Sequence, residues 1–249
     1  MKKAQLVPAL ILLLLVLGSA LPARAGVVLP PGNSLITDAG LLSEYAGDVD
    51  VFARGNSAFA VWRDGRRTES SVESDIYFAS SNDGGATWGQ NRRVSDPDFI
   101  GFTDDPSVSV APDGGIWAAW GLDICYDIGI TCGGSDSVNN DVRVALSRDG
   151  GVTWTESTIW DGEPGDIADD ISQSPQIHAD DDRIMVLVHD PVFVSGSIEG
   201  FEVYLVTRVL SPLSTTAVRL TVNNGLARAN TTTGPNLALA VNGATVCAA

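Results

Sequence analysis

The sequence predicts an all-β protein built from a repeated unit of four antiparallel strands. The first observation is an octet, SNDGGATW at residues 81–88, which returns as SRDGGVTW at residues 147–154. The second is composition: there are 26 glycines in 249 residues, and Val, Ile, Thr and Trp recur in short alternating stretches typical of strands. The third is a repeat interval of about 60 residues, enough for four strands and their turns.

The N-terminal stretch has the features of a secretory signal peptide. Lys2 and Lys3 precede an apolar core from Leu10 to Leu17, and Ala23-Arg24-Ala25 follows. We expect cleavage after Ala25, so that residues 1–25 are a signal peptide and residues 26–45 a lead-in segment; the alternative is an uncleaved anchor. The chain is therefore expected to be secreted, periplasmic or held at the cell surface, with no membrane insertion after cleavage.

The charge balance excludes some classes of partner. Without Lys2, Lys3 and Arg24, the chain carries 12 basic residues against 31 acidic ones and no lysine. Such a surface repels nucleic acid and anionic lipid, so neither is an expected partner. Its acidic loops could bind Ca²⁺, the one cofactor that the composition suggests.

Four segments repeat the same order of strands. Hairpins begin near Gly47, Asp105, Ser174 and Gly234, and third strands follow as SDIYFASS, NDVRVALS and FEVYLVTR. Four antiparallel strands per repeat describe the blade of a β-propeller. We expect a propeller at residues 46–249, with three complete blades at 46–103, 104–172 and 173–232 and the first half of a fourth at 233–249. The chain would then be incomplete at its C-terminus; a closed four-bladed ring completed by residues 27–45 is the alternative.

The octet is expected to form the turn between the third and fourth strands of a blade. Glycine supplies the positive φ that a tight turn needs, and aspartate accepts hydrogen bonds from nearby backbone N–H groups. Ser and Thr hydroxyls add backbone bonds, and the tryptophan buries its ring beneath the turn. A structural role is expected for these residues: Ser81, Asp83, Gly85, Thr87 and Trp88 in the first octet, and Ser147, Asp149, Gly151, Thr153 and Trp154 in the second.

The two octets resemble the Asp-box, or bacterial neuraminidase repeat, S-x-D-x-G-x-x-W. This motif is found in sialidases and in many other secreted β-propellers, and with the blade pattern the resemblance covers roughly residues 46–249. It implies a propeller of the sialidase superfamily, commonly with six to eight blades. It also implies that the Asp-boxes lie at the periphery, away from the active face.

The resemblance reaches the sialidase active site only in part. Sialidases bind a substrate carboxylate with three arginines and use an acid/base aspartate and a tyrosine paired with glutamate. The slot of the first arginine reads Ala46-Gly47-Asp48-Val49 here, whereas Asp64-Gly65-Arg66 fits the second. Arg66, Asp64 and Asp75 are thus the candidate catalytic residues, while the late blades that would carry the tyrosine are missing from this chain.

Cys125 and Cys132 bracket a short loop in a chain that is expected to be exported. A disulfide between them is predicted because disulfides persist outside the cytoplasm; two free thiols are the alternative. Cys247 has no evident partner. No metal site is predicted from these cysteines.

Other chemistry-bearing residues favour structural roles. His178 is expected within a strand and His189 at the end of one, each as a hydrogen-bonded structural histidine. The acidic loops at 161–170 and 180–182 are candidates for Ca²⁺ but fit solvated loops better. Three tryptophans on apolar second strands favour core packing over stacking on sugars: Trp62, Trp117 and Trp120.

The sequence therefore predicts a secreted, non-catalytic propeller with a carbohydrate or protein ligand. A sialidase-type glycoside hydrolase (exo-α-sialidase-like) is the first alternative, and a structural cell-surface module is the second. Fold alone does not decide between them.

Overall fold

The computed structural model describes residues 36–37, 46–66, 74–96, 101–124, 140–161, 174–194, 197–221, 237–242 and 245–248. The expected signal peptide, most of the lead-in segment, Cys125 and Cys132 lie outside these residues. Within this part of the chain every regular element is a strand, and it holds no helix long and apolar enough to cross a membrane.

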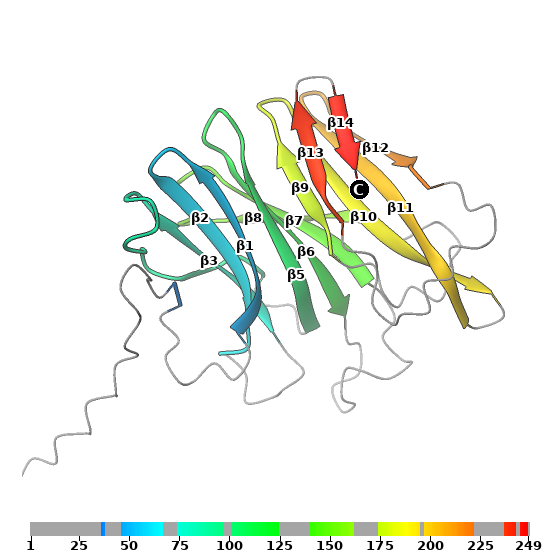
Figure 1. The fold of residues 1–249 in the computed structure, drawn as a ribbon, viewed down its shortest axis with the longest axis horizontal. Helices are drawn as coiled ribbons and strands as arrows, with labels where there is room; N and C mark the ends of the chain where they lie inside the picture. Colours follow the sequence, from blue (N-terminus) through cyan, green and yellow to red (C-terminus); the bar gives the residue numbers. More distant parts are fainter. Residues whose placement is uncertain are drawn as a thin grey trace, which may run out of the picture. The chain divides into compact units, whose positions relative to one another are not determined.

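Three four-stranded antiparallel sheets follow one another along the chain, as Figure 1 shows, and in each the strands are ordered as in the sequence. Sheet 1 contains β1 (Ala46–Arg54), β2 (Ser57–Asp64), β3 (Asp75–Ser81) and β4 (Arg92–Arg93). Sheet 2 contains β5 (Gly101–Val110), β6 (Ile116–Ile124), β7 (Asn140–Ser147) and β8 (Thr155–Trp160). Sheet 3 contains β9 (Gln176–Ala179), β10 (Arg183–Val194), β11 (Ser197–Leu210) and β12 (Leu213–Arg219); a two-stranded sheet of β13 (Leu239–Asn242) and β14 (Thr245–Ala248) follows. The expected all-β class and the four-stranded antiparallel sheets are confirmed.

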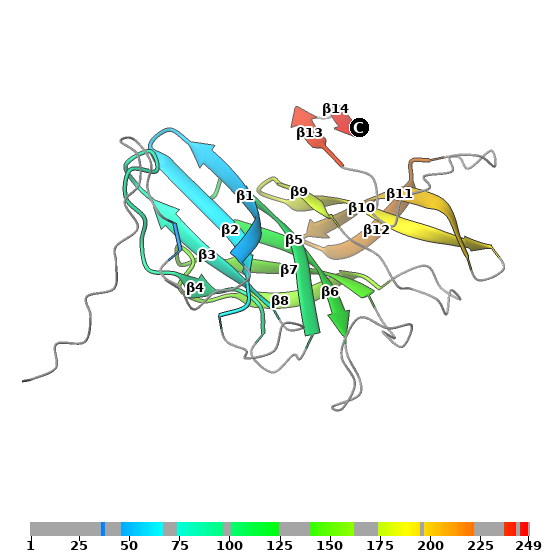
Figure 2. The ribbon, with the colours of Figure 1, turned by 60° about the horizontal axis from the view of Figure 1, so that its bottom comes forward.

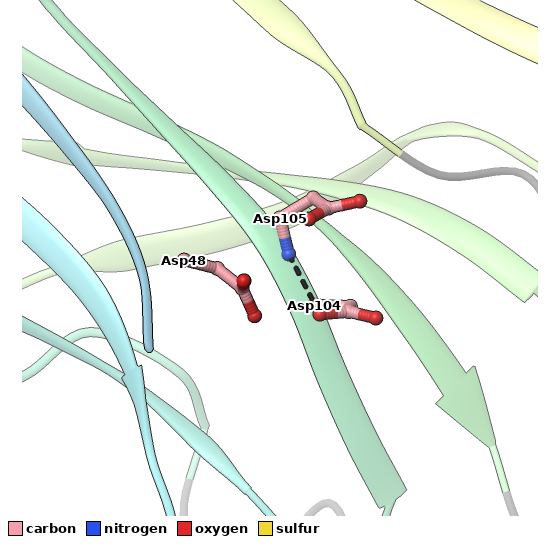
Figure 3. Close-up of side chains that lie close together, drawn as sticks. All are labelled: Asp48, Asp104 and Asp105. Atoms are coloured by element: carbon pink, nitrogen blue, oxygen red, sulfur yellow. Dashed lines mark hydrogen bonds between the residues drawn. The ribbon is translucent and has the colours of Figure 1, made fainter. Parts of the chain in front are cut away.

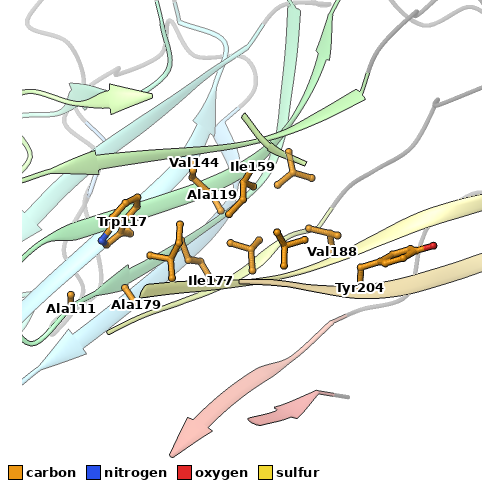
Figure 4. Packing of buried hydrophobic residues seen from close by; sticks show 13 residues of the cluster. Ala111, Trp117, Ala119, Val144, Ile159, Ile177, Ala179, Val188 and Tyr204 are labelled. Carbon is orange, nitrogen blue, oxygen red and sulfur yellow. The ribbon is translucent and has the colours of Figure 1, made fainter. Parts of the chain in front are cut away.

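Two hydrophobic clusters join consecutive sheets. Val61 and Phe78 of sheet 1 share a cluster with Trp120 of sheet 2, and a second cluster of 13 buried residues joins sheets 2 and 3 (Figure 4). The three tryptophans of the second strands are buried, with Trp62 4%, Trp117 6% and Trp120 0% exposed. Core packing of these rings is thus confirmed, and they are not available to stack on sugars.

Polar side chains link the first strands of the three sheets. The Asp50 carboxylate on β1 accepts the Val108 backbone N–H on β5 at 2.8 Å, and the Ser109 hydroxyl on β5 accepts the Ala179 N–H on β9 at 3.0 Å. Figures 1 and 2 both show β1, β5 and β9 side by side in this order. Side-chain hydrogen bonds therefore connect β1 to β5 and β5 to β9.

Each first strand has a residue in the left-handed region within it or just before it: Asp48 in β1 (φ 49°), Asp105 in β5 (φ 45°) and Ser174 two residues before β9 (φ 57°). Strands β1 and β5 each carry a bulge at this point. Short polar residues tolerate this backbone conformation better than bulky ones. The equivalent residues of the three repeats are therefore Asp48, Asp105 and Ser174. The last two each stand directly before a proline, Pro106 and Pro175.

Each octet lies in the turn between the third and fourth strands of its sheet. In the first, the Asp83 carboxylate accepts the Thr87 N–H at 2.8 Å, the Thr87 hydroxyl at 2.6 Å and the Ser81 hydroxyl at 2.7 Å. The second repeats these bonds with Asp149, Thr153 and Ser147. The hydrogen bonds from threonine, which stabilise the charged form, lower the pKa of Asp83 and of Asp149 to about 2.

Asp149→Ala should lower the melting temperature, because the Thr153 and Ser147 donors lose a charged acceptor. The carboxylate is exposed, so these donors turn to water instead of being stranded in the core. With a pKa below that of the unfolded chain, Asp149 stabilises the fold above about pH 4, and this contribution disappears as the pH falls through about 2. Thermal unfolding at pH 7 measures the loss. Asp182→Ala, which removes an exposed acid from another turn, is the control; equal melting temperatures in the two variants would contradict the turn's structural role.

The third sheet has no such octet. Its turn between β11 and β12 is made by Ser211 and Pro212, and the Leu210 N–H donates to the Asp182 carbonyl.

Candidate functional site

The octet turns and the bulges of the first strands β1 and β5 lie at opposite ends of the strands. Ala46 at the start of β1 pairs with Asp64 at the end of β2, which pairs with Asp75 at the start of β3. The octet follows the far end of β3, where the Gly84 N–H donates to the Asn56 carbonyl of the β1–β2 turn. Compact turns thus lie at one end of the strands, and the first strands start at the other end.

A cleft of about 230 Å³ lies at the starts of these first strands. Its polar lining consists of the carboxylates of Asp48, Asp50 and Asp105, the Ser174 hydroxyl and the Gln176 amide. Its apolar lining consists of Val49, Pro106 and Leu237. The cleft therefore combines hydrogen-bond acceptors and donors with small apolar surfaces, contributed by three successive repeats and by Leu237, which lies two residues before β13. We call it the axial cleft.

Asp48 and Asp105, which line the axial cleft, belong to a cluster of three carboxylates with Asp104 (Figure 3). Asp48, Asp104 and Asp105 each offer an oxygen, and these atoms lie within 4.8 Å of one another. Arg63 on β2 forms ion pairs with Asp48 (3.0 Å) and Asp104 (2.9 Å), which offsets part of their repulsion. The Asp105 side chain accepts a hydrogen bond from Ser174.

Asp104 is the most perturbed acid of this cluster. Burial, followed by the charge of Asp105, raises the pKa of Asp104 to about 7, although Arg63 acts in the opposite direction. The carboxyl can therefore hold a proton near neutral pH, which makes it able to donate as well as accept a hydrogen bond.

The three candidate catalytic residues lie apart from the axial cleft and none lines it. The Arg66 guanidinium binds Asp64 at 2.6 Å, Thr37 at 2.9 Å and Asn91 at 3.1 Å, and it stacks 4.2 Å from the centre of the Tyr77 ring. Asp64 is completely buried and also accepts the Trp62 indole N–H. These contacts give Arg66 and Asp64 a structural role at the end of β2.

Asp75 is likewise held inside sheet 1. Its carboxylate accepts the Ser95 hydroxyl at 3.0 Å and lies 3.7 Å from Arg93. It faces Asp64 directly across β2 and β3. These contacts are typical of a residue that fixes the start of a strand rather than of an acid/base residue.

The two histidines differ from each other. His178 on β9 contacts Asp180 at 3.2 Å. His189 lies inside β10 rather than at its end, is fully buried, and has no hydrogen-bond partner for either ring nitrogen among the described residues. The expectation of a hydrogen-bonded histidine at 189 is therefore wrong for this part of the chain: the ring instead packs edge-on against Phe201, with burial lowering its pKa to about 4.

The acidic loops proposed for Ca²⁺ are only partly described. Residues 162–170 lie outside the described ranges. Asp180 pairs with Arg183 and His178, and Asp181 accepts the Asp113 N–H at 2.7 Å. Cys247 on β14 is exposed and forms no disulfide within the part of the chain that the structure describes.

The sequence pattern alone did not single out the axial cleft. Its residues belong to three repeats, and each is a short polar residue beside a strand start, a common place for such residues. The usable signal was the aligned Asp48, Asp105 and Ser174, since a short polar residue at one register in successive repeats indicates a shared backbone requirement.

Comparisons with known proteins support the fold. No known protein family matches the sequence, and no curated protein is detectably similar to it. Among solved structures, a protein of unknown function from Dyadobacter fermentans is 16% identical with a TM-score of 0.54, and covers 72% of this chain and 56% of its own length. An endo-arabinase from Bacteroides thetaiotaomicron is 10% identical with a TM-score of 0.50, covering 76% of this chain and 67% of its own. An α-L-arabinofuranosidase, Arb93A from Fusarium graminearum, is 16% identical with a TM-score of 0.50, covering 74% and 51%.

These likenesses define the class of fold. The described sheets have the arrangement of propeller-type glycoside hydrolases, in which four-stranded antiparallel blades follow one another. The chain spans about half to two thirds of the length of these solved structures.

Proposed function

We propose that this chain is an exported Asp-box propeller that binds a neutral saccharide in the axial cleft without cleaving it. The lining of the cleft is the observation that carries this proposal. Three carboxylates, a hydroxyl and an amide offer hydrogen bonds to sugar hydroxyls, and Val49, Pro106 and Leu237 offer contacts to C–H groups. At about 230 Å³ the cleft lies below the roughly 300–1,000 Å³ of drug-sized ligand sites, which suits a ligand portion of about one sugar ring.

The charge of the cleft favours a neutral over an anionic ligand. Asp48, Asp50 and Asp105 line it, and the neighbouring Arg63 is engaged by Asp48 and Asp104. A sugar acid would meet carboxylates where a sialidase presents arginines, so its own carboxylate would be repelled. A neutral sugar has no such penalty.

The chain's fold and its predicted export support the same proposal. The similar solved structures include an endo-arabinase and an α-L-arabinofuranosidase, so arabinan is a suitable first probe. The predicted signal peptide would place the protein where extracellular polysaccharide is found.

Calorimetric titration with neutral oligosaccharides, arabinohexaose among them, tests the proposal. Asp48→Asn should weaken binding at least tenfold, because an amide replaces an acceptor oxygen with a donor and releases Arg63; tenfold corresponds to about 1.4 kcal/mol. Asp182→Asn removes the same charge from the turn between β9 and β10, at the other end of the strands, and should leave affinity unchanged. Unaltered affinity in Asp48→Asn would locate binding elsewhere. If no saccharide bound, the protein-ligand or structural-module alternatives would replace the proposal.

Glycoside hydrolysis is a second candidate because one observation favours it. Asp104, with a pKa of about 7, lies beside two other carboxylates, and glycosidases pair a protonated acid with a second carboxylate. Turnover of a fluorogenic arabinofuranoside that disappears in Asp104→Asn, with the fold intact, would establish this function. We expect no release of sialic acid from a fluorogenic sialoside, since Arg66 is engaged in sheet 1; release that is lost in Arg66→Ala would favour the sialidase alternative.

A further inference from the structure

A second, larger hollow lies at the periphery, between the outer strands of sheets 1 and 2. Its volume is about 490 Å³. It is lined by residues 93–96, which begin in the two-residue strand β4, and by residues of β7, the second octet and β8. The hollow is formed entirely by residues of the first two sheets and the segments next to them, so it is separate from the axial cleft.

One wall of the peripheral hollow is apolar and built on the second octet. Trp154 packs edge-on against Phe78 with ring centres 5.3 Å apart, and its indole N–H donates to the Gly151 carbonyl at 3.2 Å. The polar atom of the indole is therefore engaged within the protein, and the part of the ring that remains partly exposed is apolar. Val152 beside it is 55% exposed, although the equivalent position of the first octet is the smaller Ala86.

The neighbouring wall, which includes Glu156 two residues after Trp154, is charged and held in place by its own hydrogen bonds. The Arg143 guanidinium donates to Glu156 at 2.8 Å and to the Thr158 hydroxyl at 2.5 Å, and the second Glu156 oxygen accepts the Asp96 N–H at 2.8 Å. The side chains of Arg143 and Glu156 are only 11% and 10% exposed. This wall is thus preorganised, and a ligand would not have to order it on binding.

The charges around the hollow balance each other. Arg93, Arg143, Asp96 and Glu156 all line the hollow, together with Trp154. A balanced set favours neither anions nor cations, whereas an aromatic ring beside fixed charged groups suits a ligand that has both C–H faces and hydroxyls. Neutral saccharides have this chemistry.

We infer that the peripheral hollow is a second binding site for a neutral saccharide, holding a sugar chain against Trp154 and the adjacent Arg143–Glu156 pair. This inference rests on the proposed glycan-binding function but uses residues that the axial cleft does not share. Its volume, about twice that of the axial cleft, admits more than one sugar ring. A protein with both sites would bind a polysaccharide at two points and gain avidity from the linkage.

Titration of the full chain with arabinohexaose, cellohexaose and maltohexaose, followed by calorimetry and by tryptophan fluorescence, tests the inference. We expect two sites for at least one hexasaccharide, with sialyllactose binding to neither. Val152→Glu places a charge on the apolar wall and should weaken the peripheral site at least tenfold while sparing the axial one. Val218→Glu places the same charge on an exposed valine of β12, outside both clefts, and should change neither affinity by more than about twofold.

The two sites fail independently, so their outcomes are distinguishable. Binding that Val152→Glu abolishes and Asp48→Asn leaves intact supports the peripheral site even if the axial proposal fails. Binding that responds only to Asp48→Asn, or no binding of any hexasaccharide, overturns the inference. Melting temperatures of both variants near that of the wild type ensure that a lost site does not reflect unfolding.

Discussion

Gly151→Ala should destabilise the protein by roughly 3–5 kcal/mol, since strain in the backbone adds to a steric clash. Gly151 has φ of +90°, and a Cβ built there would lie 2.1 Å from the Cε1 atom of Phe78. Phe78 is itself buried in the cluster that joins sheets 1 and 2, so it cannot move without disturbing that packing. Urea unfolding measures the loss.

Gly85→Ala is the matched control because Gly85 occupies the same place in the first octet. Its φ is +89°, but an added Cβ would meet only the Trp88 ring at 3.7 Å, an ordinary contact distance. We expect this variant to lose about 1–2 kcal/mol, the cost of a left-handed alanine. A Phe78→Leu background should restore part of the loss in Gly151→Ala and none in Gly85→Ala. Equal losses in the two alanine variants would contradict a packing role for Gly151.

His189→Leu should remove a pH dependence worth about 3 kcal/mol between pH 7 and pH 4. The histidine is buried, and burial lowers its pKa from an ordinary 6.5 to about 4. The unfolded chain therefore binds a proton over this window that the folded chain does not. Stability linked to His189 is complete above about pH 6.5 and is lost as the pH falls toward 4.

Asp104 acts in the opposite direction over nearly the same window. Its folded pKa of about 7 lies above the ordinary 3.8, so its contribution is complete below about pH 4 and is lost as the pH rises through 7. The two slopes partly cancel in the wild type. His189→Leu should expose a protein that becomes less stable as pH rises, and Asp104→Asn one that becomes more stable.

Urea unfolding at pH 4.0, 5.5 and 7.0 on the wild type and both variants measures these slopes. His178→Gln serves as the control, since His178 is partly exposed and paired with Asp180. A wild-type pH profile that persists unchanged in His189→Leu would show that the ring gains a proton in the folded state. At pH 7 His189→Leu should be at least as stable as the wild type. This substitution removes two ring nitrogens that have no hydrogen-bond partner among the described residues.

Local features of the chain were predictable because their causes are local. The octets carry their own turn: glycine permits the positive φ, and Asp83 or Asp149 bonds to a threonine four residues later. Alternating apolar residues gave the strands and the buried Trp62 and Trp120. None of this depends on which other strand lies nearby.

The match of Asp64-Gly65-Arg66 to a catalytic motif is ambiguous for a physical reason. A D-x-R sequence suits an arginine that binds substrate and equally one that binds its own aspartate. The tertiary structure decides between them by placing Thr37, Asn91 and the Tyr77 ring around the guanidinium. The first of these partners is 29 residues away along the chain.

The sequence by itself determined the all-β class, the four-stranded repeat and the octet turns, because hydrogen bonds within a few residues and the period of two in a strand specify them. The tertiary structure decided where the two clefts lie. The axial cleft brings together Asp48, Asp105 and Ser174 from three successive repeats, and the peripheral hollow brings residues 93–96 to Arg143 and Trp154. Such sites depend on which surfaces the hydrophobic clusters bring together, and that packing is a property of the whole chain.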